Sequence, residues 1–313
     1  MLFDRVAELT VGEANGNAVV INDLRFSFSI EKDNDKSTNK LTLKIYNMNK
    51  QTRSIVEHVN NNVILKAGYK DDIGAVTIFT GSVVSAWTIS VGNDIITELS
   101  VRDGILPLRD TKISLSYIKG TSALSILDDV MESFSIPVKP LPKNLIDKFY
   151  YGGYSFCGKA EGAMSEICHY LGLTWSIQNN EIQILDKNSP FGDEIVVLTP
   201  ENGLINIPER IIDATRKKSQ GDSSPPSGMV LSESFKEGEH FQIDGYKVNC
   251  LLQPRIYPGC YVGLESNVLL LDPLIDSSNT NRPRAFFRAE TVIHRGDTHE
   301  NDWLTECQLK SIG

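Results

Sequence analysis

Alternating apolar and polar side chains near the start of the chain predict a pair of β-strands. In residues 24–30 and again in residues 41–46, an apolar side chain occupies every second position, which is typical of strands that bury one face. The ten residues from Glu31 to Lys40 that join them contain no apolar side chain. We therefore expect a long polar loop that projects from the sheet and contacts a partner.

The alternation continues to about residue 102, interrupted by one helix. Asn49 is a suitable cap for a short helix over residues 50–59. Gly92-Asn93 suits the two-residue turn of a β-hairpin, with glycine first as type II′ turns prefer. The expected strands cover residues 63–69, 76–84, 86–91 and 95–102. About six strands in so short a length predict a compact antiparallel barrel or sandwich.

The middle of the chain has helical periodicity instead. Apolar residues recur at steps of three and four in residues 121–134, before a proline, and again in residues 159–171, where Gly172 provides a stop. The hairpin that follows turns at Asn179-Asn180, residues that tolerate the positive φ of a type I′ turn. Helix, helix and hairpin together predict a small α+β unit.

A strand pattern returns from Ile195 to the end of the chain. Two short strands are expected around residues 200–203, more strands within residues 245–265, and a last pair within residues 286–312. Residues 215–228 are rich in Ser, Pro and Gly, so we expect a surface loop or a partly disordered segment there.

A chain of 313 residues is too long for one ordinary core. We therefore predict three domains: an N-terminal β-barrel over residues 1–110, an inserted α+β domain over residues 111–193 and a second β-barrel over residues 194–313. The fold class is mainly β, with two antiparallel barrels flanking the insertion.

The composition is that of a globular protein, with 41% hydrophobic residues, 23% charged residues and a formal net charge of -9. An acidic balance argues against a protein that grips nucleic acid by neutralising phosphates. The first residues lack the basic and apolar segments of a signal peptide, and no run approaches the ~20 apolar residues of a membrane span. We expect no membrane anchor.

Five cysteines make an odd number and contain no CxxC motif. We expect all of them to be reduced thiols that are buried as small hydrophobic residues, in preference to disulfides or metal ligands. They are Cys157, Cys168, Cys250, Cys260 and Cys307.

Three groups of residues are candidates for chemical sites. His294, Asp297 and His299 offer metal ligands, but we favour a hairpin turn in which His294 and Asp297 hydrogen-bond the backbone and His299 is exposed. Acidic pairs on the two helices resemble the two carboxylates of a glycosidase, but their apolar neighbours face elsewhere, so solvated surfaces are favoured. These acids are Asp128, Asp129, Glu161 and Glu166.

Tyrosines between the two helices are the third group. Tyr150, Tyr151 and Tyr154 suit a sugar-stacking or protein-binding patch, and domain packing is the preferred interpretation. No nucleophile elbow or phosphate-binding loop occurs. We therefore assign no catalytic, cofactor-binding or metal-binding residue, expect no cofactor, and predict a protein that is not an enzyme.

Residues at both ends of the chain form a wider pattern. Near the N-terminus, the run LRFSF is followed by Asn39, by Ile45-Tyr46-Asn47 and by Arg53, with Met48 where a leucine is usual. The corresponding residues near the C-terminus are Leu251, Leu252, Pro254, Pro258, Gly259, Val262, His294, Gly296, Asp297, Trp303 and Thr305. In order and spacing these residues resemble the tail hub, or baseplate hub, proteins of tailed bacteriophages. The middle unit matches only in position and general type.

The resemblance implies a structural virion protein of the phage tail baseplate, assembled in the host cytoplasm. It implies a homotrimer in which two tube-like barrels per chain give six similar barrels, so that the ring adapts a sixfold tail tube to a threefold central spike and contacts other baseplate proteins. Genomic DNA would pass through the ring without specific binding, and the acidic balance suits such a channel. The loop from Glu31 to Lys40 would then contact a neighbouring ring or subunit.

Three alternatives stay open at this point. One is a tail enzyme that degrades cell walls, and another is a tail protein that binds a carbohydrate or a receptor. The third is a hub-like component of a contractile injection machine that carries no DNA.

Overall fold

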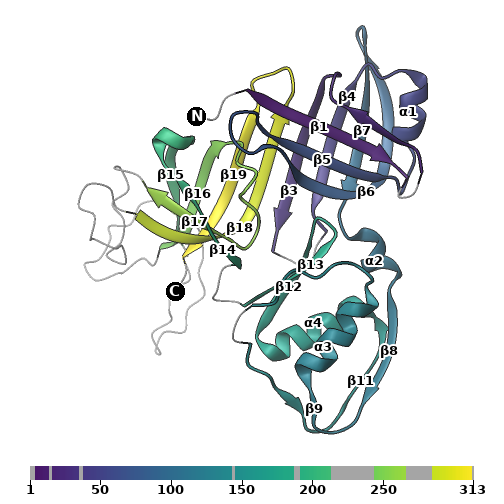
Figure 1. The fold of residues 1–313 in the computed structure, drawn as a ribbon, viewed down its shortest axis with the longest axis vertical. Coiled ribbons are helices and arrows are strands. Elements are labelled where there is room, and N and C mark those ends of the chain that lie inside the picture. The colour runs from purple at the N-terminus through teal and green to yellow at the C-terminus, as the bar shows by residue number, and fades with distance from the viewer. Residues whose placement is uncertain are drawn as a thin grey trace, which may run out of the picture.

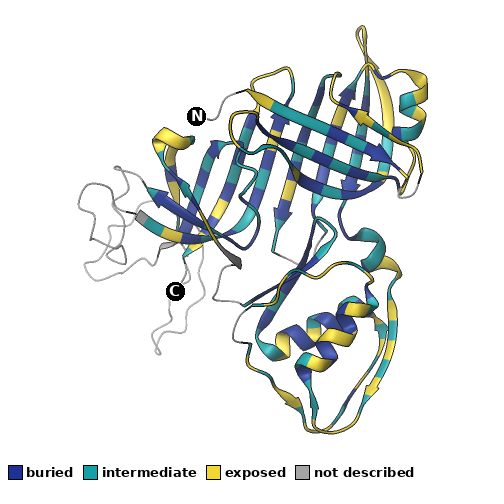
Figure 2. Ribbon diagram, in the orientation of Figure 1, coloured by how far each residue is buried: buried dark blue, intermediate teal, exposed yellow. Residues whose placement is uncertain are grey.

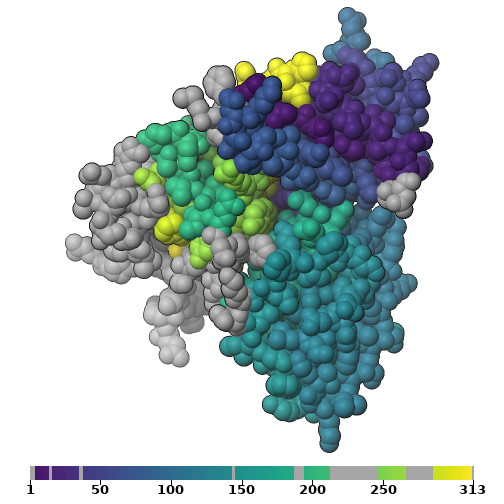
Figure 3. Space-filling view, viewed as in Figure 1, coloured from purple at the N-terminus to yellow at the C-terminus, as the bar shows by residue number. Residues whose placement is uncertain are grey.

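The computed structural model describes residues 4–13, 16–34, 38–142, 145–186, 191–212, 243–265 and 284–311. The described part is mainly β, as predicted, and one large sheet connects the two ends of the chain (Figure 1). The α+β unit projects from the two β-rich regions, as the space-filling view in Figure 3 shows.

The N-terminal region contains the predicted strands and the predicted helix. Its elements are β1 (Arg5–Gly12), β2 (Ala18–Ile21), β3 (Phe26–Asp33), β4 (Lys40–Tyr46), α1 (Lys50–Val56), β5 (Asn62–Tyr69), β6 (Gly74–Val91) and β7 (Asp94–Arg102). The side chain of Asn49 accepts a hydrogen bond from the N–H of Thr52, which caps α1 as predicted. Gly92 has a φ of 62° in the turn between β6 and β7.

Two details of this region differ from the prediction. Helix α1 ends at Val56, so Val59 is 47% exposed and does not face the core. The two strands expected on either side of Ser85 form a single strand, β6, which tolerates a register shift between Val83 and Ser85. A bulge lets a strand bend without ending, which an interruption in the alternation does not reveal.

The middle region is an α+β unit, as predicted. Its elements are α2 (Ile105–Asp110), β8 (Lys112–Tyr117), β9 (Thr121–Ser122), α3 (Ala123–Ser133), β10 (Phe149–Tyr150), β11 (Tyr154–Lys159), α4 (Ala160–Leu171), β12 (Leu173–Gln178) and β13 (Glu181–Asp186). Gly172 ends α4 with a φ of 84°, and Asn179 and Asn180 turn the last hairpin with φ of 57° and 63°. The positive φ values are those that a type I′ turn requires.

The C-terminal region returns to β-structure. Its elements are β14 (Phe191–Leu198), the short 3-10 helix η1 (Pro200–Asn202), β15 (Leu204–Ile212), β16 (Ile243–Leu251), β17 (Cys260–Glu265), β18 (Arg284–Asp297) and β19 (Trp303–Ser311). The polar segment predicted over residues 215–228 lies outside the described residues.

Strand β18 joins the N-terminal and C-terminal regions into one sheet. It pairs with β19 on one side, and on the other side it pairs first with β17 and then with β3, from Thr291 opposite Asp33 to Asp297 opposite Ser27. The order of strands is β15-β16-β19-β18-β3-β4-β7-β6-β5-β1-β2, and no pairing among the described strands closes it. The two β-rich regions are therefore fixed to each other by backbone hydrogen bonds.

Buried side chains form three hydrophobic clusters, one in each region (Figure 2). The N-terminal cluster also contains Leu252 and Trp303 from the C-terminal region. Four of the cysteines are buried, but Cys157 is exposed on β11, which corrects the expectation that all five are buried. Side chains alternate between the two faces of β11, and the neighbouring Phe156 packs against the core, so Cys157 faces solvent.

Candidate functional site

Motif residues from three segments near the C-terminus meet in the structure. The N–H of Leu252 donates to the carbonyl oxygen of Trp303 at 3.0 Å, and the N–H of Gln253 donates to the hydroxyl of Thr305 at 2.9 Å. Thr305 Oγ1 also lies 2.8 Å from His294 Nδ1. These hydrogen bonds thus connect the loop after β16 with strands β18 and β19.

His294 is a structural residue at the centre of this hydrogen-bond network. Its side chain is buried, and its ring hydrogen-bonds both Thr305 and the backbone of Ile256. Burial, together with the positive charge of Lys32, lowers the pKa of His294 to about 3. The imidazole is therefore neutral at pH 7, and it holds the loop instead of exchanging protons.

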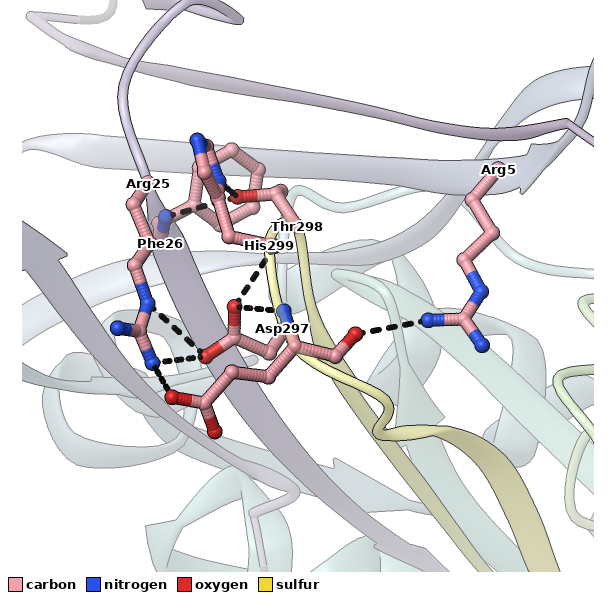
Figure 4. A network of polar contacts seen from close by, with 7 residues as sticks. Arg5, Arg25, Phe26, Asp297, Thr298 and His299 are labelled. Atoms are coloured by element: carbon pink, nitrogen blue, oxygen red, sulfur yellow. Dashed lines mark hydrogen bonds and ion pairs between the residues drawn. The ribbon is translucent and has the colours of Figure 1, made fainter.

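Asp297 organises the turn between β18 and β19. Its Oδ1 accepts hydrogen bonds from the backbone N–H of His299 at 2.8 Å and of Glu300 at 3.0 Å, as predicted for the turn. Its Oδ2 accepts from Arg25 at 2.9 Å (Figure 4). Burial alone would raise the pKa of Asp297, but these hydrogen bonds lower it below its ordinary value.

Two arginines from the N-terminal region hold this turn in place. Arg25, which stacks on the ring of Tyr46 at 4.4 Å, also contacts the carboxylate of Glu300. Arg5 donates to the carbonyl oxygens of Glu300 at 2.9 Å and Asn301 at 3.1 Å. Arg5 on β1 and Arg25, which directly precedes β3, thereby hold the turn between β18 and β19, as Figure 4 shows.

Trp303 fills the space beneath the turn. Its ring meets Phe28 edge-on, with centroids 5.7 Å apart, and the guanidinium of Arg5 lies 5.6 Å from its centre. Gly296 makes this packing possible, because a Cβ there would lie 2.4 Å from the Phe28 ring and 2.8 Å from the Trp303 ring. The glycine of the motif is required by close packing.

A second polar cluster attaches the middle unit, and it corrects the expectation for residues 31–40. Strand β3 continues to Asp33, and both Lys32 and Asn39 are buried. The Nζ of Lys32 donates to Asn179 Oδ1 at 2.7 Å and lies 5.7 Å from the centre of the Phe79 ring. The ends of the loop therefore contact the β12–β13 hairpin of the same chain; residues 35–37 lie outside the described residues.

Asp103 is the centre of this cluster, which we call the polar junction: Lys32, Asn39, Asp103, Gln178 and Asn179. Asp103 accepts from the N–H of Asn39 at 2.8 Å, from its side-chain amide at 2.7 Å and from the N–H of Asn179 at 3.1 Å. Burial raises the pKa of Asp103 and lowers the pKa of Lys32. The hydrogen bonds offset the cost of burying these charges.

The remaining candidates occupy the surface of the middle unit. Asp128 and Asp129 are exposed on α3, and the hydroxyl of Tyr117 donates to Asp129 at 2.7 Å. Glu161 and Glu166 lie on α4, with Glu166 exposed. The structure therefore places these acids on helix surfaces, as expected from the sequence.

The tyrosines take different roles. The ring of Tyr150 packs between those of Tyr154 and Tyr170, with centroid distances of 4.8 Å and 4.7 Å. Tyr150 and Tyr154 belong to the hydrophobic core of the middle unit. Tyr151 is 82% exposed. The packing is internal to this unit and does not join two domains.

Within the described ranges, no three His, Cys, Asp or Glu side chains are grouped so that they could hold a metal ion. None of the helices in those ranges has the length and apolar composition that crossing a bilayer requires.

Sequence reasoning found His294, Asp297 and Thr305 through the motif, but it missed Arg5, Asp103 and Lys32. Arg5 and Lys32 occur in alternating strands, where a charged residue ordinarily faces solvent. Their partners are distant in sequence, so no local signal identifies them.

Solved structures of tail proteins share this architecture. A tail protein from Neisseria meningitidis is 15% identical, with a TM-score of 0.60, over 99% of this chain and 97% of that one. The tail protein of prophage MuSo2 from Shewanella oneidensis is 11% identical, with a TM-score of 0.64, over 98% and 97%. A type VI secretion component from E. coli, which exhibits structural similarity to bacteriophage T4 tail proteins, is 7% identical, with a TM-score of 0.55, over 97% and 77%.

No protein-family model matches this sequence, nor does the sequence of any curated protein. The structural likeness spans nearly the whole chain and agrees with the residues that suggested tail proteins at both of its ends. The chain has the fold of phage tail proteins.

Proposed function

We propose that this chain is a structural hub protein of a phage tail, acting as a homotrimer. The observation that carries the proposal is the continuous sheet through β18, which fixes two β-rich regions of one chain to each other. A trimer of such chains presents six β-rich units, each region forming a tube-like barrel in the assembled ring. Symmetric closure also covers sheet edges that would otherwise promote aggregation.

The hub adapts a sixfold tail tube to a threefold central spike and contacts other baseplate proteins. The same architecture would serve a phage-like injection machine, and the likeness to a type VI secretion component supports that range. The role is non-enzymatic, since the acids considered for catalysis lie on helix surfaces and the buried His294 has a structural role.

The solvent-facing side of the long sheet suits a channel for DNA. Three ion pairs lie on it: Lys44 with Glu98 at 3.1 Å, Lys247 with Glu306 at 2.9 Å and Arg295 with Glu306 at 3.8 Å. A cation that is already paired with a carboxylate has less attraction for phosphate. We propose that this face lines the channel and lets DNA pass without specific binding.

Analytical ultracentrifugation over a range of concentrations tests the proposal. The chain has a mass of 34.8 kDa, so a trimer has three times that, 104.4 kDa. Electron microscopy of the assembled fraction should show rings with a central channel. A chain that stays monomeric at all concentrations contradicts the proposal, and lysis of peptidoglycan in a turbidity assay would favour an enzyme instead.

A further inference from the structure

The hairpin formed by β6 and β7 has a free edge and an apolar face. Strand β5 pairs with β6 only as far as Ser82, and beyond the register shift β6 pairs with β7 alone among the described residues. In this half of β6 three apolar side chains alternate on one face, with Trp87 45%, Ile89 42% and Val91 54% exposed. The turn of the hairpin stands clear of the molecule at the top of Figures 1 and 3.

Such an edge is costly to leave open. No described strand pairs with its backbone groups on one side, and it contains no proline that would protect it. An edge strand that is rich in β-branched and aromatic residues tends to pair with another chain. This half of β6 therefore has the chemistry of a strand that pairs with a partner.

A second edge lies at the other end of the same sheet. Within the described ranges, β15 pairs only with β16, and its Ile207 is 60% exposed. Asn206 has a φ of 64° at a bulge beside Pro208, so regular pairing to β16 resumes at Glu209. Strands β15 and β6 lie on opposite sides of the molecule in Figure 1.

The strand directions at the two edges are suited to antiparallel pairing between copies. From β15 to β6 the sheet contains eight strands, and each neighbouring pair is antiparallel. An even number of antiparallel strands gives the two edge strands opposite directions. A cyclic operation about an axis along the strands would therefore place β15 of a second copy antiparallel to β6, as at every other junction in this run.

We propose that the free edge of β6, from Ser85 to Val91, pairs with the β15 edge of a second copy of this chain, and that Trp87, Ile89 and Val91 pack against that copy's Ile207. The contact is head-to-tail, so three copies close a ring when each step rotates the chain by a third of a turn. This inference rests on the proposed trimer and specifies the surfaces that build it.

The variant Ile89→Lys tests this interface, with Val20→Lys as its matched control. Both positions are exposed β-branched residues on edge strands, since Val20 is 52% exposed on β2. A lysine on an edge opposes pairing with another chain. We expect Ile89→Lys to raise the concentration for half-assembly about tenfold or more, whereas Val20→Lys assembles like the wild type. Circular dichroism and thermal unfolding of both variants report whether the monomer stays folded.

Hydrogen exchange provides a second measurement that needs no substitution. Amides in residues 85–91 and 204–212 should gain protection together as the wild type assembles, and β2 should not. A wild-type trimer that resists Ile89→Lys, or that protects β2 instead of β6, overturns the interface while the hub function stands. A wild-type chain that remains monomeric overturns the hub function and this interface with it.

Discussion

Arg25 and Asp297 are 272 positions apart in the sequence, and the Nη2 of Arg25 lies 2.9 Å from the Oδ2 of Asp297. The pair ties the residue directly before β3 to the turn between β18 and β19. Because Asp297 also accepts two backbone N–H groups, the turn and the strand share one carboxylate.

Replacing Asp297 with asparagine should destabilise the chain. We expect the free energy of unfolding to fall by about 1–3 kcal/mol at pH 7, as for the loss of hydrogen bonds to a charged group. The pKa of Asp297 is lowered in the folded state, so its contribution is present above the ordinary pKa of a carboxyl group and is lost as the pH falls through the folded value. Urea unfolding at pH 7 and pH 3 measures both effects.

The matched control is Asp110→Asn. Asp110 also pairs with an arginine, Arg109, at 2.7 Å, but both side chains are exposed and the two residues are adjacent in sequence. It should leave the unfolding midpoint unchanged. If Asp297→Asn lowers the unfolding midpoint no more than Asp110→Asn does, the link between the chain ends contributes no stability.

His294 should make stability fall in mild acid. Its folded pKa of about 3 is below the ordinary 6.5, so the neutral ring contributes stability that is fully present above pH 6.5 and is lost as the pH falls towards 3. The full difference corresponds to about 5 kcal/mol. Unfolding measured from pH 7.5 to pH 4 should show this slope, and His294→Asn should flatten it.

His299→Asn is the control for this profile, since His299 is exposed in the same turn. NMR titration adds a direct measurement, in which the ring signals of His294 should not shift between pH 7.5 and pH 4. A titration near pH 6.5 would contradict the buried neutral ring.

Much of the fold follows from local pattern. Alternation located β3, β4, β5 and β7, Asn49 marked the cap of α1, and Gly172 and Asn179-Asn180 marked turns, because each of these signals is a property of neighbouring residues. The pairing of β3 with β18 could not be predicted this way, since alternation gives no partner. The proposed domain boundaries remain predictions, although residues from the C-terminal region complete the N-terminal core.

Gly296→Ala should destabilise the packing below the turn. The new Cβ would meet the Phe28 ring at 2.4 Å and the Trp303 ring at 2.8 Å, so both large side chains must move. We expect a loss of about 1–3 kcal/mol, typical of overpacking. The control Gly152→Ala meets no atom within 4 Å and should have little effect. If this clash causes the loss of stability in Gly296→Ala, adding Phe28→Leu should recover part of that loss in a double-mutant cycle.

Asn39→Ala should loosen the middle unit. The side-chain amide of Asn39 donates to Asp103, to the carbonyl oxygen of Ile177 and to Gln178, all within 3.0 Å, so its removal leaves buried acceptors without this donor. We expect a loss of about 1–3 kcal/mol. Hydrogen exchange should increase at the β12–β13 hairpin more than in the N-terminal sheet, because the polar junction holds the hairpin there.

Gln51→Ala is the matched amide replacement for this experiment, since Gln51 is exposed on α1. It should change stability by less than about 0.5 kcal/mol. The residues between Glu31 and Lys40 look like a free polar loop in sequence, yet Asn39 is 3% exposed. If Asn39→Ala behaves like Gln51→Ala, the ends of that loop do not hold the middle unit. A local rise in hydrogen exchange would instead show that buried polar contacts in this segment attach the middle unit, whereas apolar contacts hold the rest of the chain together.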